Sequence, residues 1–230
     1  MKQIYEGKAK ILFEESGDII QYFKDDTTAF NNQKFAISDG KGVLNNAISA
    51  YFMNKIEYSG VKTHFINKID DRHQRVKFVE IIPLEVIVRN ISAGSFCKKF
   101  GVTRGLNLTK PLVEFSLKDD NLGDPLIPEG HIVELNIASY DDIAYLKARA
   151  LKINSILQDE FSKIGVVLVD FKVEFGRKDG DIILADEISP DSCRLWDIKT
   201  SESLDKDLFR EGKGNIVEGY RVIAKRLGLI

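Results

Sequence analysis

Carboxylates recur through the segment LVDFKVEFGRKDGDIILADEISPD at residues 168–191, which otherwise alternates like a pair of β-strands. Asp170, Lys172 and Glu174 occupy every second position, so a strand here presents all three on one face. The opposite face is wholly apolar and has to be packed. Ionised groups on a half-buried strand are costly unless cations pair with them. The pattern therefore favours a charged functional site over an exposed acidic hairpin.

The position of Asp186 relative to this face depends on the loop of the predicted hairpin. A two-residue loop at 179–180 turns Asp186 away, whereas a three-residue loop at 178–180 reverses the parity. We predict the three-residue loop, which puts Asp186 opposite Lys172 and one diagonal step from Glu174. Carboxylates this close raise one another's pKa unless cations intervene. Lys172 is one such cation, and Mg²⁺, which binds carboxylate and phosphate oxygens, is the natural second.

Two further segments contain residue types that bind phosphate. In YEGKAK, Gly7 allows close backbone approach, and Lys8 and Lys10, two apart on a strand, face the same side. In IIPLEVIVRNISAGSF, an apolar run ends at Arg89, whose guanidinium can hold a carboxylate or phosphate, and Ser95 opens a short helical run. A solvated strand edge and a plain strand-to-helix corner remain the alternatives. No Walker A or GxGxxG pattern occurs, which excludes P-loop and Rossmann sites.

The segment DSCRLW follows the hairpin directly and adds Asp191 and Arg194, a second possible anion clamp. The histidines are scattered without metal-ligand spacing. We expect His64, His73 and His131 to lie on the surface or in loops.

The composition of the 230 residues is that of an ordinary globular protein, with 43% apolar and 30% charged residues. A net charge of −2 gives no basic field for nucleic acid or a membrane surface. No apolar run approaches the roughly 20 residues of a membrane span, and the N-terminus lacks a signal-peptide core. Cys97 and Cys193 form neither a disulfide framework nor a zinc motif, so we expect a reduced cytoplasmic protein.

The elements that must position these residues follow an α+β pattern rather than an alternation of strands and helices. A β-rich N-terminal lobe at 1–80 against a mixed lobe at 81–230 would leave a ligand cleft between them. We expect strands at 3–14, 18–24, 61–69, 75–89 and the 168–185 hairpin, helices at 43–60, from Ser139 to Gly165 and through 216–227, and mostly loop at 101–137.

Several of these segments together resemble a known family. LVDFKVEFG and IIPLEVIVRNISAGS are similar to the two signature segments of phosphoribosylaminoimidazole-succinocarboxamide synthase, or SAICAR synthetase. YEGKAK, DDTTAF, KGVLNN and DEISPDSCRLWD resemble its other segments in the same order, from about residue 4 to residue 228. The length resembles the short bacterial form. The resemblance implies a two-lobed α+β fold with the nucleotide between the lobes, and a homodimer.

The resemblance also implies the reaction and the roles of individual residues. The family joins L-aspartate to the carboxylate of carboxyaminoimidazole ribonucleotide (CAIR), cleaving ATP to ADP and phosphate in purine biosynthesis. The implied ATP-binding residues are Gly7, Lys8, Lys10, Leu12, Glu80, Ile81, Ile82 and Glu174. The implied CAIR-binding residues are Glu85, Arg89, Ser95, Asp191 and Arg194. Glu174 and Asp186 resemble the Mg²⁺ ligands, Asp170, Lys172 and Asp191 the catalytic residues, and Lys118, Asp120 and Asp124 a loop near the substrates.

One position departs from the family. Some members have Asp-Gly after the DDTTAF-like segment, where this chain has Asn31 and Asn32, so we expect no catalytic acid at Asn31. The expected mechanism phosphorylates the CAIR carboxylate, and the aspartate amine then attacks the acyl phosphate. Asp170 and Asp191 are both candidates for the base. A two-lobed small-molecule kinase and a non-catalytic nucleotide-binding module are the competing interpretations.

Overall fold

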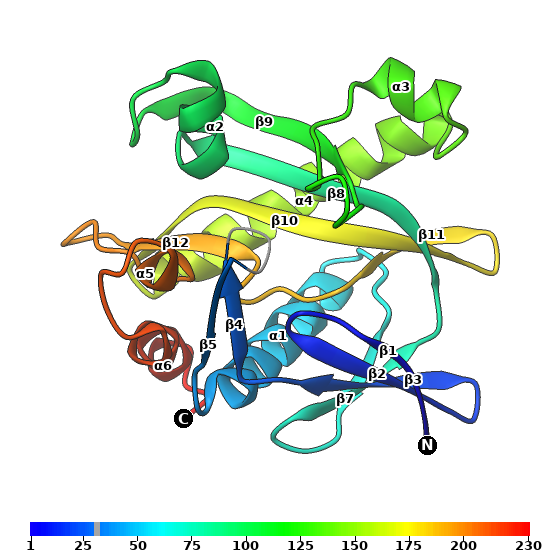
Figure 1. The fold of residues 1–230 in the computed structure, drawn as a ribbon, viewed down its shortest axis with the longest axis horizontal. Helices are drawn as coiled ribbons and strands as arrows, with labels where there is room; N and C mark the ends of the chain where they lie inside the picture. Colours follow the sequence, from blue (N-terminus) through cyan, green and yellow to red (C-terminus); the bar gives the residue numbers. More distant parts are fainter. Residues whose placement is uncertain (30–32) are drawn as a thin grey trace.

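The computed structural model describes residues 1–29 and 33–230. Within these residues the chain forms two five-stranded sheets and a two-stranded ribbon, which together with the helices give the α+β class expected from the sequence. The N-terminal sheet has the order β1-β2-β3-β7-β6, and the central sheet the order β11-β10-β8-β9, with β12 also paired to β10. Figure 1 shows the N-terminal sheet at the bottom and the central sheet above it.

The bounds of the elements follow. The N-terminal sheet consists of β1 (Lys2–Glu6), β2 (Lys10–Glu15), β3 (Asp18–Phe23), β6 (Phe65–Lys68) and β7 (His73–Lys77), and the ribbon of β4 (Asp26–Ala29) and β5 (Lys34–Ile37). The central sheet consists of β8 (Glu80–Ile91), β9 (Asn107–Leu117), β10 (Val166–Lys178), β11 (Asp181–Ala185) and β12 (Cys193–Asp197). The helices are α1 (Lys41–Tyr58), α2 (Gly94–Phe100), α3 (Glu129–Glu134), α4 (Tyr140–Lys163), α5 (Asp207–Arg210) and α6 (Ile216–Arg226).

Helix α4 forms where its apolar spacing predicts it. Its start has a capping box: the Asp142 amide donates to Ser139 Oγ, and the Ser139 amide donates to the Asp142 carboxylate. The helix ends before Gly165, whose φ of 68° is easily adopted only without a side chain. The buried stripe of α4 packs behind β10 and so supports the strand that carries the predicted acids.

One apolar core joins the helices to the central sheet. Ile48 and Phe52 of α1 belong to the same buried cluster as Val86 of β8 and Val173 of β10. Helix α1 also contacts α6, so the first 80 residues contribute to the core behind the central sheet. The division into lobes at 80 and 81 coincides with the passage from the N-terminal sheet to β8, and it stays a prediction.

The segment 101–137 is more ordered than its composition indicates, and the expectation of mostly loop is wrong. It contains the edge strand β9 and the helix α3. The sequence of β9 includes Pro111 and has only a weak alternation, because much of the strand is exposed. Pairing with β8, from Leu84 opposite Leu117 to Ile91 opposite Asn107, fixes it instead.

The hairpin has the two-residue loop, so the predicted three-residue register is wrong. Glu174 pairs with Ala185, and Lys178 pairs with Asp181 across a tight turn. Asp179 and Gly180 both have positive φ, as a type I′ turn requires. This choice suits the right-handed twist of the two strands, a preference that outweighs the charge argument used to predict the longer loop.

The N-terminal run expected at 3–14 is divided into β1 and β2 by a turn. The Gly7 amide donates to the Lys10 carbonyl, and Lys8 lies in the turn rather than on a strand. The expected same-side placement of Lys8 and Lys10 therefore does not come from strand alternation. None of the described helices has the length and apolar composition needed to cross a membrane.

Candidate active site

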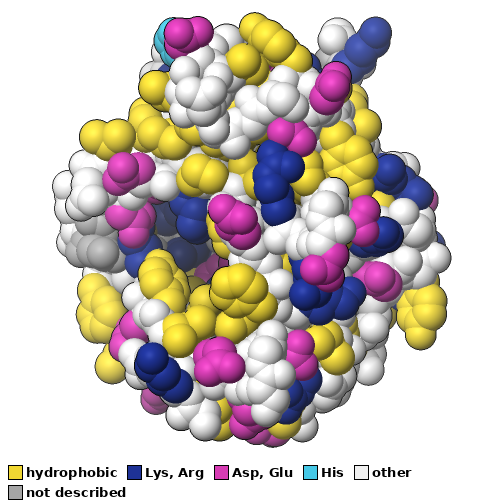
Figure 2. Space-filling view, turned by 90° about the vertical axis from the view of Figure 1, so that its right-hand side faces the viewer, with side chains coloured by type: hydrophobic (Ala, Val, Ile, Leu, Met, Phe, Trp, Pro, Cys, Tyr) yellow, Lys and Arg dark blue, Asp and Glu magenta, His cyan; other side chains and the backbone are white. Residues whose placement is uncertain are grey.

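A cavity of about 670 Å³ lies between the β1–β2 turn, the β7–β8 connection, the middle of β10 and the end of β11. Figure 2 shows a hollow on one face of the molecule, with Lys and Arg side chains inside it and acidic side chains beside it. Most of the residues predicted from the sequence to form the site line this one cavity. They are Gly7, Lys8, Lys10, Leu12, Ile81, Glu85, Lys118, Asp120, Asp124, Lys172, Glu174, Asp186 and Asp191.

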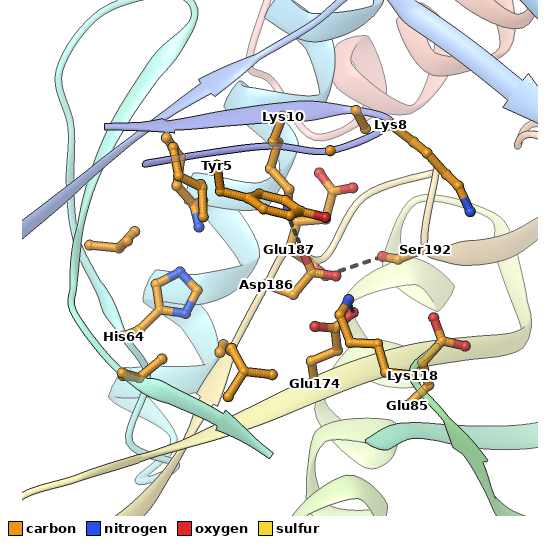
Figure 3. A pocket seen from close by; sticks show the side chains of 18 of the residues that line it. Tyr5, Lys8, Lys10, His64, Glu85, Lys118, Glu174, Asp186, Glu187 and Ser192 are labelled. Carbon is orange, nitrogen blue, oxygen red and sulfur yellow. Dashed lines mark hydrogen bonds and ion pairs between the residues drawn. The ribbon is translucent and has the colours of Figure 1, made fainter. Parts of the chain in front are cut away.

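A group of alternating charges, here called the lysine–acid cluster, consists of Lys10, Lys118, Lys172, Glu85, Glu174 and Asp186. Lys172 Nζ lies 2.7 Å from Glu174 Oε1, 2.9 Å from Glu85 Oε1 and 3.5 Å from Asp186 Oδ2. Lys118 Nζ lies 2.6 Å from Glu174 Oε1, and Lys10 forms an ion pair with Asp186. Figure 3 shows five members of the cluster around one space: Lys10, Glu85, Lys118, Glu174 and Asp186.

Asp186 reaches this cluster by a route that the sequence argument did not consider. Its strand ends at Ala185, and Asp186 has a φ of 61°. Asp186 therefore no longer follows the alternation of β11, and its carboxylate lies beside Lys172 although the two-residue register alone would turn it away.

The charges of the cluster reinforce one another. Burial raises the pKa of Asp186, but the nearby Lys10, Lys172 and Lys118 outweigh burial and hold it far below its usual range. Burial likewise lowers the pKa of Lys172, but Glu174, Asp186 and Glu85 raise it well above its ordinary value. Asp186 and Lys172 are therefore both ionised at neutral pH.

The donor set fits a magnesium ion that arrives with a nucleotide. No group of three or more metal-binding side chains occurs in the part of the chain that the structure describes. Glu174 and Asp186 nevertheless bring two carboxylates to the one ammonium of Lys172, so they already hold a cation between them. Mg²⁺ commonly binds through one or two carboxylates, with substrate phosphates and water completing its octahedron.

A second group, here called the arginine cluster, consists of Arg89, Ser95, Asp170 and Arg194. Arg89 Nη1 lies 3.0 Å and Arg194 Nη1 2.8 Å from Asp170 Oδ2. Arg89 Nη2 donates to Ser95 Oγ at 3.2 Å. The sheet sets this arrangement, because Asp170 pairs with Arg89 on β8 and with Arg194 on β12.

Two neighbours hold the Arg194 guanidinium in place. Its Nε donates to the Asp207 carboxylate at 2.7 Å, and a Cβ added to Gly94 would lie 2.3 Å from Arg194 Nη2. Gly94 also has a φ of 55°, so both its backbone and the space beside it require glycine. Burial lowers the pKa of Arg194, but Asp170 and Asp207 outweigh burial and raise it. Arg194 is thus a positive charge held in a fixed place beside Asp170.

Asp191 is held by residues that the sequence analysis missed. Its Oδ2 accepts from Lys41 Nζ at 2.6 Å and from Asn45 Nδ2 at 2.9 Å, and its Oδ1 accepts from Tyr220 Oη at 2.6 Å. Burial raises the pKa of Asp191, but Lys206 and Lys41 hold it well below its usual range. Lys41, Asn45 and Tyr220 lie in α1 and α6, far from Asp191 in sequence, so no local pattern links them.

His64 lies in the bend before β6, in line with the loop position expected for it, but it is buried, with 2% of its surface accessible. It lines the cavity together with Gln21. A signal for Gln21 exists in the sequence, since it stands between Ile19 and Phe23 on the inward face of an otherwise apolar strand. The sequence around His64 has no such signal.

The remaining predicted residues have diverse positions. Ile82 is buried in the core and Glu80 is exposed, so neither side chain lines the cavity. Asp120 lies in the loop after β9, and its Oδ1 is 2.6 Å from Lys8 Nζ in the β1–β2 turn. This ion pair joins the two segments across the cavity mouth. Asn31 and Asn32 lie outside the described residues.

Comparisons with known proteins agree over the whole chain. A sequence model of the family described as SAICAR synthetase matches residues 3–227. The chain is 55% identical to phosphoribosylaminoimidazole-succinocarboxamide synthase 1 of Caulobacter vibrioides, with 100% of this chain and 93% of that protein covered. The crystal structure of phosphoribosylaminoimidazole-succinocarboxamide synthase from Ehrlichia chaffeensis has a TM-score of 0.97 at 48% identity, covering 100% of this chain and 99% of that one. A structure described as SAICAR synthetase (Type-2) in complex with ADP has a TM-score of 0.95, also at 48% identity, with 97% and 96% covered.

Proposed function

This chain belongs to the SAICAR synthetase family, and from that premise we propose how its cleft joins L-aspartate to CAIR with cleavage of ATP. Members of this family are ligases that form a carbon–nitrogen bond in purine biosynthesis. The assignment of the site rests on one observation: three charged residues lie on the same face of β10. Asp170 belongs to the arginine cluster, Glu174 to the lysine–acid cluster, and Lys172 lies between them on one strand.

The lysine–acid cluster is the proposed site of the ATP phosphates. Lys10 within the cluster and Lys8 beside it supply positive charge, and the backbone of Gly7, which also lines the cavity, allows a close approach. Glu174 and Asp186 would hold Mg²⁺, which supplies neutralising positive charge to the phosphates. The adenine is proposed to lie near the backbone of 80–82, with Leu12 on its other side.

The arginine cluster is the proposed site of CAIR. Arg89 and Arg194 present planar guanidinium groups that can each hold an anion with two hydrogen bonds, and Ser95 adds a hydroxyl. Glu85, the member of the lysine–acid cluster on β8, lines the cavity and contacts Lys172, and we assign it to CAIR as well. We assign Asp191 to the same substrate, because it lines the cavity and Lys41, Asn45 and Tyr220 hold its carboxylate in place.

The proposed chemistry has two steps. The CAIR carboxylate oxygen attacks the terminal phosphorus of ATP, which forms a carbon–oxygen–phosphorus bond and releases ADP. The aspartate amine then attacks the carbonyl carbon, phosphate leaves with the bonding electrons of the carbon–oxygen bond, and the amine loses its proton. Lys172 lies where it can neutralise charge on the transferring phosphoryl group, because it already contacts Glu174 and Asp186.

The carboxylates considered as bases differ in their surroundings. Asp191 has a pKa well below its usual range, which makes it a weak proton acceptor. Asp170 also contacts two cations, the guanidinium groups of Arg89 and Arg194, so both carboxylates stay in the proposed catalytic set and neither is singled out as the base. Lys118, Asp120 and Asp124 are proposed to close the cavity over the reacting groups, because water would hydrolyse an acyl phosphate.

An assay of ADP release tests this function against the kinase alternative. We expect release only when ATP, CAIR and L-aspartate are all present, with one SAICAR formed per ADP. Release of ADP with CAIR alone and a stable phosphorylated product would instead indicate a kinase. Binding of ATP without turnover under any combination of substrates would indicate a nucleotide-binding module.

We also propose a cytoplasmic homodimer. Two free cysteines, Cys97 and Cys193, support a reducing compartment, and family resemblance supports the dimer. Light scattering on the purified chain should give twice the 26.0 kDa of the monomer. A single mass of 26.0 kDa at micromolar concentration would contradict the dimer.

A further inference from the structure

Glu114 is a largely buried carboxylate on β9 that the proposed chemistry does not use. Its side chain is 12% exposed, and its Oε2 accepts a hydrogen bond from Arg89 Nε. Arg89, which is itself 3% exposed, is the only partner of the Glu114 carboxylate in the part of the chain that the structure describes. A carboxylate removed from most of its water is destabilising unless a cation compensates for the loss. The role of Glu114 therefore has to be sought in what it does to Arg89.

The register of the central sheet brings Glu114 to the face that carries the arginine cluster. Strand β9 runs beside β8, which in turn lies beside β10 (Figure 1). Arg89 on β8 lies opposite Leu112 of β9 and opposite Asp170 of β10. Glu114 is two residues beyond Leu112, so it shares the same face and is a diagonal neighbour of Arg89. Strand pairing rather than a loop thus fixes Glu114 beside the guanidinium.

Arg194 has the same arrangement on the other side of Asp170. Its Nε donates to the Asp207 carboxylate at 2.7 Å, as the Nε of Arg89 does to Glu114. Asp170 receives only Nη1 of each guanidinium, at 3.0 Å from Arg89 and 2.8 Å from Arg194. Each arginine is therefore held at Nε by a carboxylate of its own and shares Asp170 through one terminal nitrogen.

The two Nε contacts prevent the arginines from closing on Asp170. Arginine and a carboxylate pair most strongly when two nitrogens of the fork donate side by side. With a free Nε, the guanidinium of Arg89 could rotate into that geometry and turn its donors toward Asp170. The observed contacts instead leave Arg89 Nη2 beside Ser95, and within the described residues Arg194 Nη2 donates to no protein group. These nitrogens stay available to an anion.

We propose that Glu114 is a positioning residue of the CAIR site, which with Asp207 on the other side keeps both guanidinium groups open for the substrate. Glu114 acts through Arg89, whose Nε edge it holds, and does not contact the substrate. This inference rests on the proposed function in taking CAIR as the anion of the arginine cluster.

Equilibrium binding of CAIR, without ATP or L-aspartate, tests the proposal. Glu114→Leu removes the acceptor and keeps a side chain of similar size, whereas Glu114→Gln keeps an oxygen acceptor at the same place. Glu134→Leu, the same substitution at an exposed position of α3, is the matched control. Isothermal titration gives the Kd for CAIR, and a separate titration with ADP and Mg²⁺ reports on the nucleotide site.

We expect Glu114→Leu to raise the Kd for CAIR roughly tenfold, because the loss of one charged hydrogen bond lets the Arg89 guanidinium rotate. Glu114→Gln should raise it only about threefold, since a neutral oxygen still accepts from Nε. The control should match wild type, and the Kd for ADP should change by less than about twofold throughout. Glu114→Leu that binds CAIR as tightly as the control would overturn the proposal. An equal loss of CAIR and ADP binding would also overturn it and indicate a general structural role.

A double-mutant cycle identifies the residue through which Glu114 acts. Lysine has no Nε, so Arg89→Lys removes the contact that Glu114 makes. Adding Glu114→Leu to Arg89→Lys should therefore raise the Kd for CAIR by less than about threefold further. A full tenfold further increase would mean that Glu114 acts independently of Arg89 and would contradict the proposal.

Wild-type protein provides a measurement that depends neither on the stability of a variant nor on the ligase reaction. The Nε–H protons of Arg89 and Arg194 should exchange with water at least roughly tenfold more slowly than that of exposed Arg221, because carboxylates hold them. Addition of CAIR should leave both protons protected, since the substrate takes the Nη nitrogens. An Arg89 Nε–H that exchanges as fast as that of Arg221, with or without CAIR, would contradict the proposal.

The same resonance separates a failure of this inference from a failure of the proposed function. If wild-type protein does not bind CAIR, the proposed substrate is wrong. Protection of the Arg89 Nε–H in wild type and its loss in Glu114→Leu would then still establish that Glu114 positions Arg89. Equal exchange in the two proteins would overturn the positioning role whether or not CAIR binds.

Discussion

The lysine–acid cluster and the arginine cluster hold their carboxylates in different ways. Glu174 is held by the ammonium groups of Lys118 and Lys172, at 2.6 and 2.7 Å. Asp170 lies between the planar guanidinium groups of Arg89 and Arg194. An ammonium on a flexible stem can move aside when another cation arrives, whereas a guanidinium fork has a fixed geometry for one anion. The first cluster therefore suits exchange of cations, and the second suits recognition of a shape.

Strand β10 connects the two clusters, because it carries one carboxylate of each. Asp170 and Glu174 are four residues apart on one face, which separates them by about 13 Å along an extended strand. That strand pairs with β8 and packs on the buried stripe of α4. The spacing between the proposed CAIR and phosphate sites is thus set by a buried strand rather than by loops.

Replacing Glu174 by Gln should have the largest effect, because it removes the charge that the lysine–acid cluster is built around. Lys118 and Lys172 would lose their shared partner, and the proposed magnesium site would lose one carboxylate. We expect turnover to fall roughly 10²-fold or more, the scale of losing one preorganised electrostatic group. Steady-state measurement of ADP release at saturating substrates gives this number.

Asp181→Asn is the matched control for that change, since Asp181 lies on the same hairpin but is exposed and pairs only with exposed Lys62 among the described residues. Its turnover should stay within about twofold of wild type, as expected for a surface ion pair. Glu174→Gln with turnover as high as the control would mean that the acids have no part in catalysis and would favour the nucleotide-binding module.

Replacing Arg89 by Lys should affect the other cluster and change a different parameter. Lysine keeps the charge but loses the fork that contacts Asp170 and Ser95. We expect KM for CAIR to rise roughly 10- to 10²-fold, equivalent to about 1.5–3 kcal/mol for a charged hydrogen bond, while kcat changes less. Substrate-saturation curves with CAIR separate the two parameters.

Arg221→Lys serves as the control, because Arg221 is an exposed residue of α6 paired with Glu218 and belongs to neither cluster. Its KM and kcat should match those of wild type. A loss of kcat in Arg89→Lys with an unchanged KM for CAIR would reverse the division of labour between the two clusters.

The sequence predicts the face of β10 because strand alternation is a local property. Asp170, Lys172 and Glu174 needed only the period of two to be placed together. The capping box of α4 was equally local, since Ser139 and Asp142 are three residues apart.

The rest of the site depends on interactions that no local pattern contains. The position of Asp186 depends on one backbone angle after β11, so the correct carboxylate was found with the wrong register. The partners Lys41 and Tyr220 reach Asp191 from helices 150 and 29 residues away. Strand β9 is held by its pairing with β8 rather than by its own pattern.

A partly exposed ion pair between α4 and β10 provides the smallest effect and a reference for both clusters. Asp142 accepts from Arg177 and from the Ser139 amide, and these contacts lower its pKa from 3.8 to about 2. Because the folded-state pKa lies below the unfolded value, the ionised carboxylate stabilises the fold above pH 3.8, and this contribution is lost as the pH falls toward 2. The Arg177 side chain is 41% exposed, so solvent screening limits the contribution to about 1 kcal/mol.

Asp142→Asn should therefore reduce the free energy of unfolding by about 1 kcal/mol at pH 7, and the difference from wild type should shrink toward zero as the pH falls from about 4 to about 2. Urea denaturation at several pH values measures it, with Asp141→Asn, the exposed neighbour in the same helical turn, as control. A constant difference across this range would mean that the charge of Asp142 contributes nothing and that geometry alone caps the helix. The Asp142–Arg177 pair could then not serve as the surface value against which the buried ion pairs are compared. The effect of burial on a carboxylate–cation contact would have to be measured from variants of the two clusters alone.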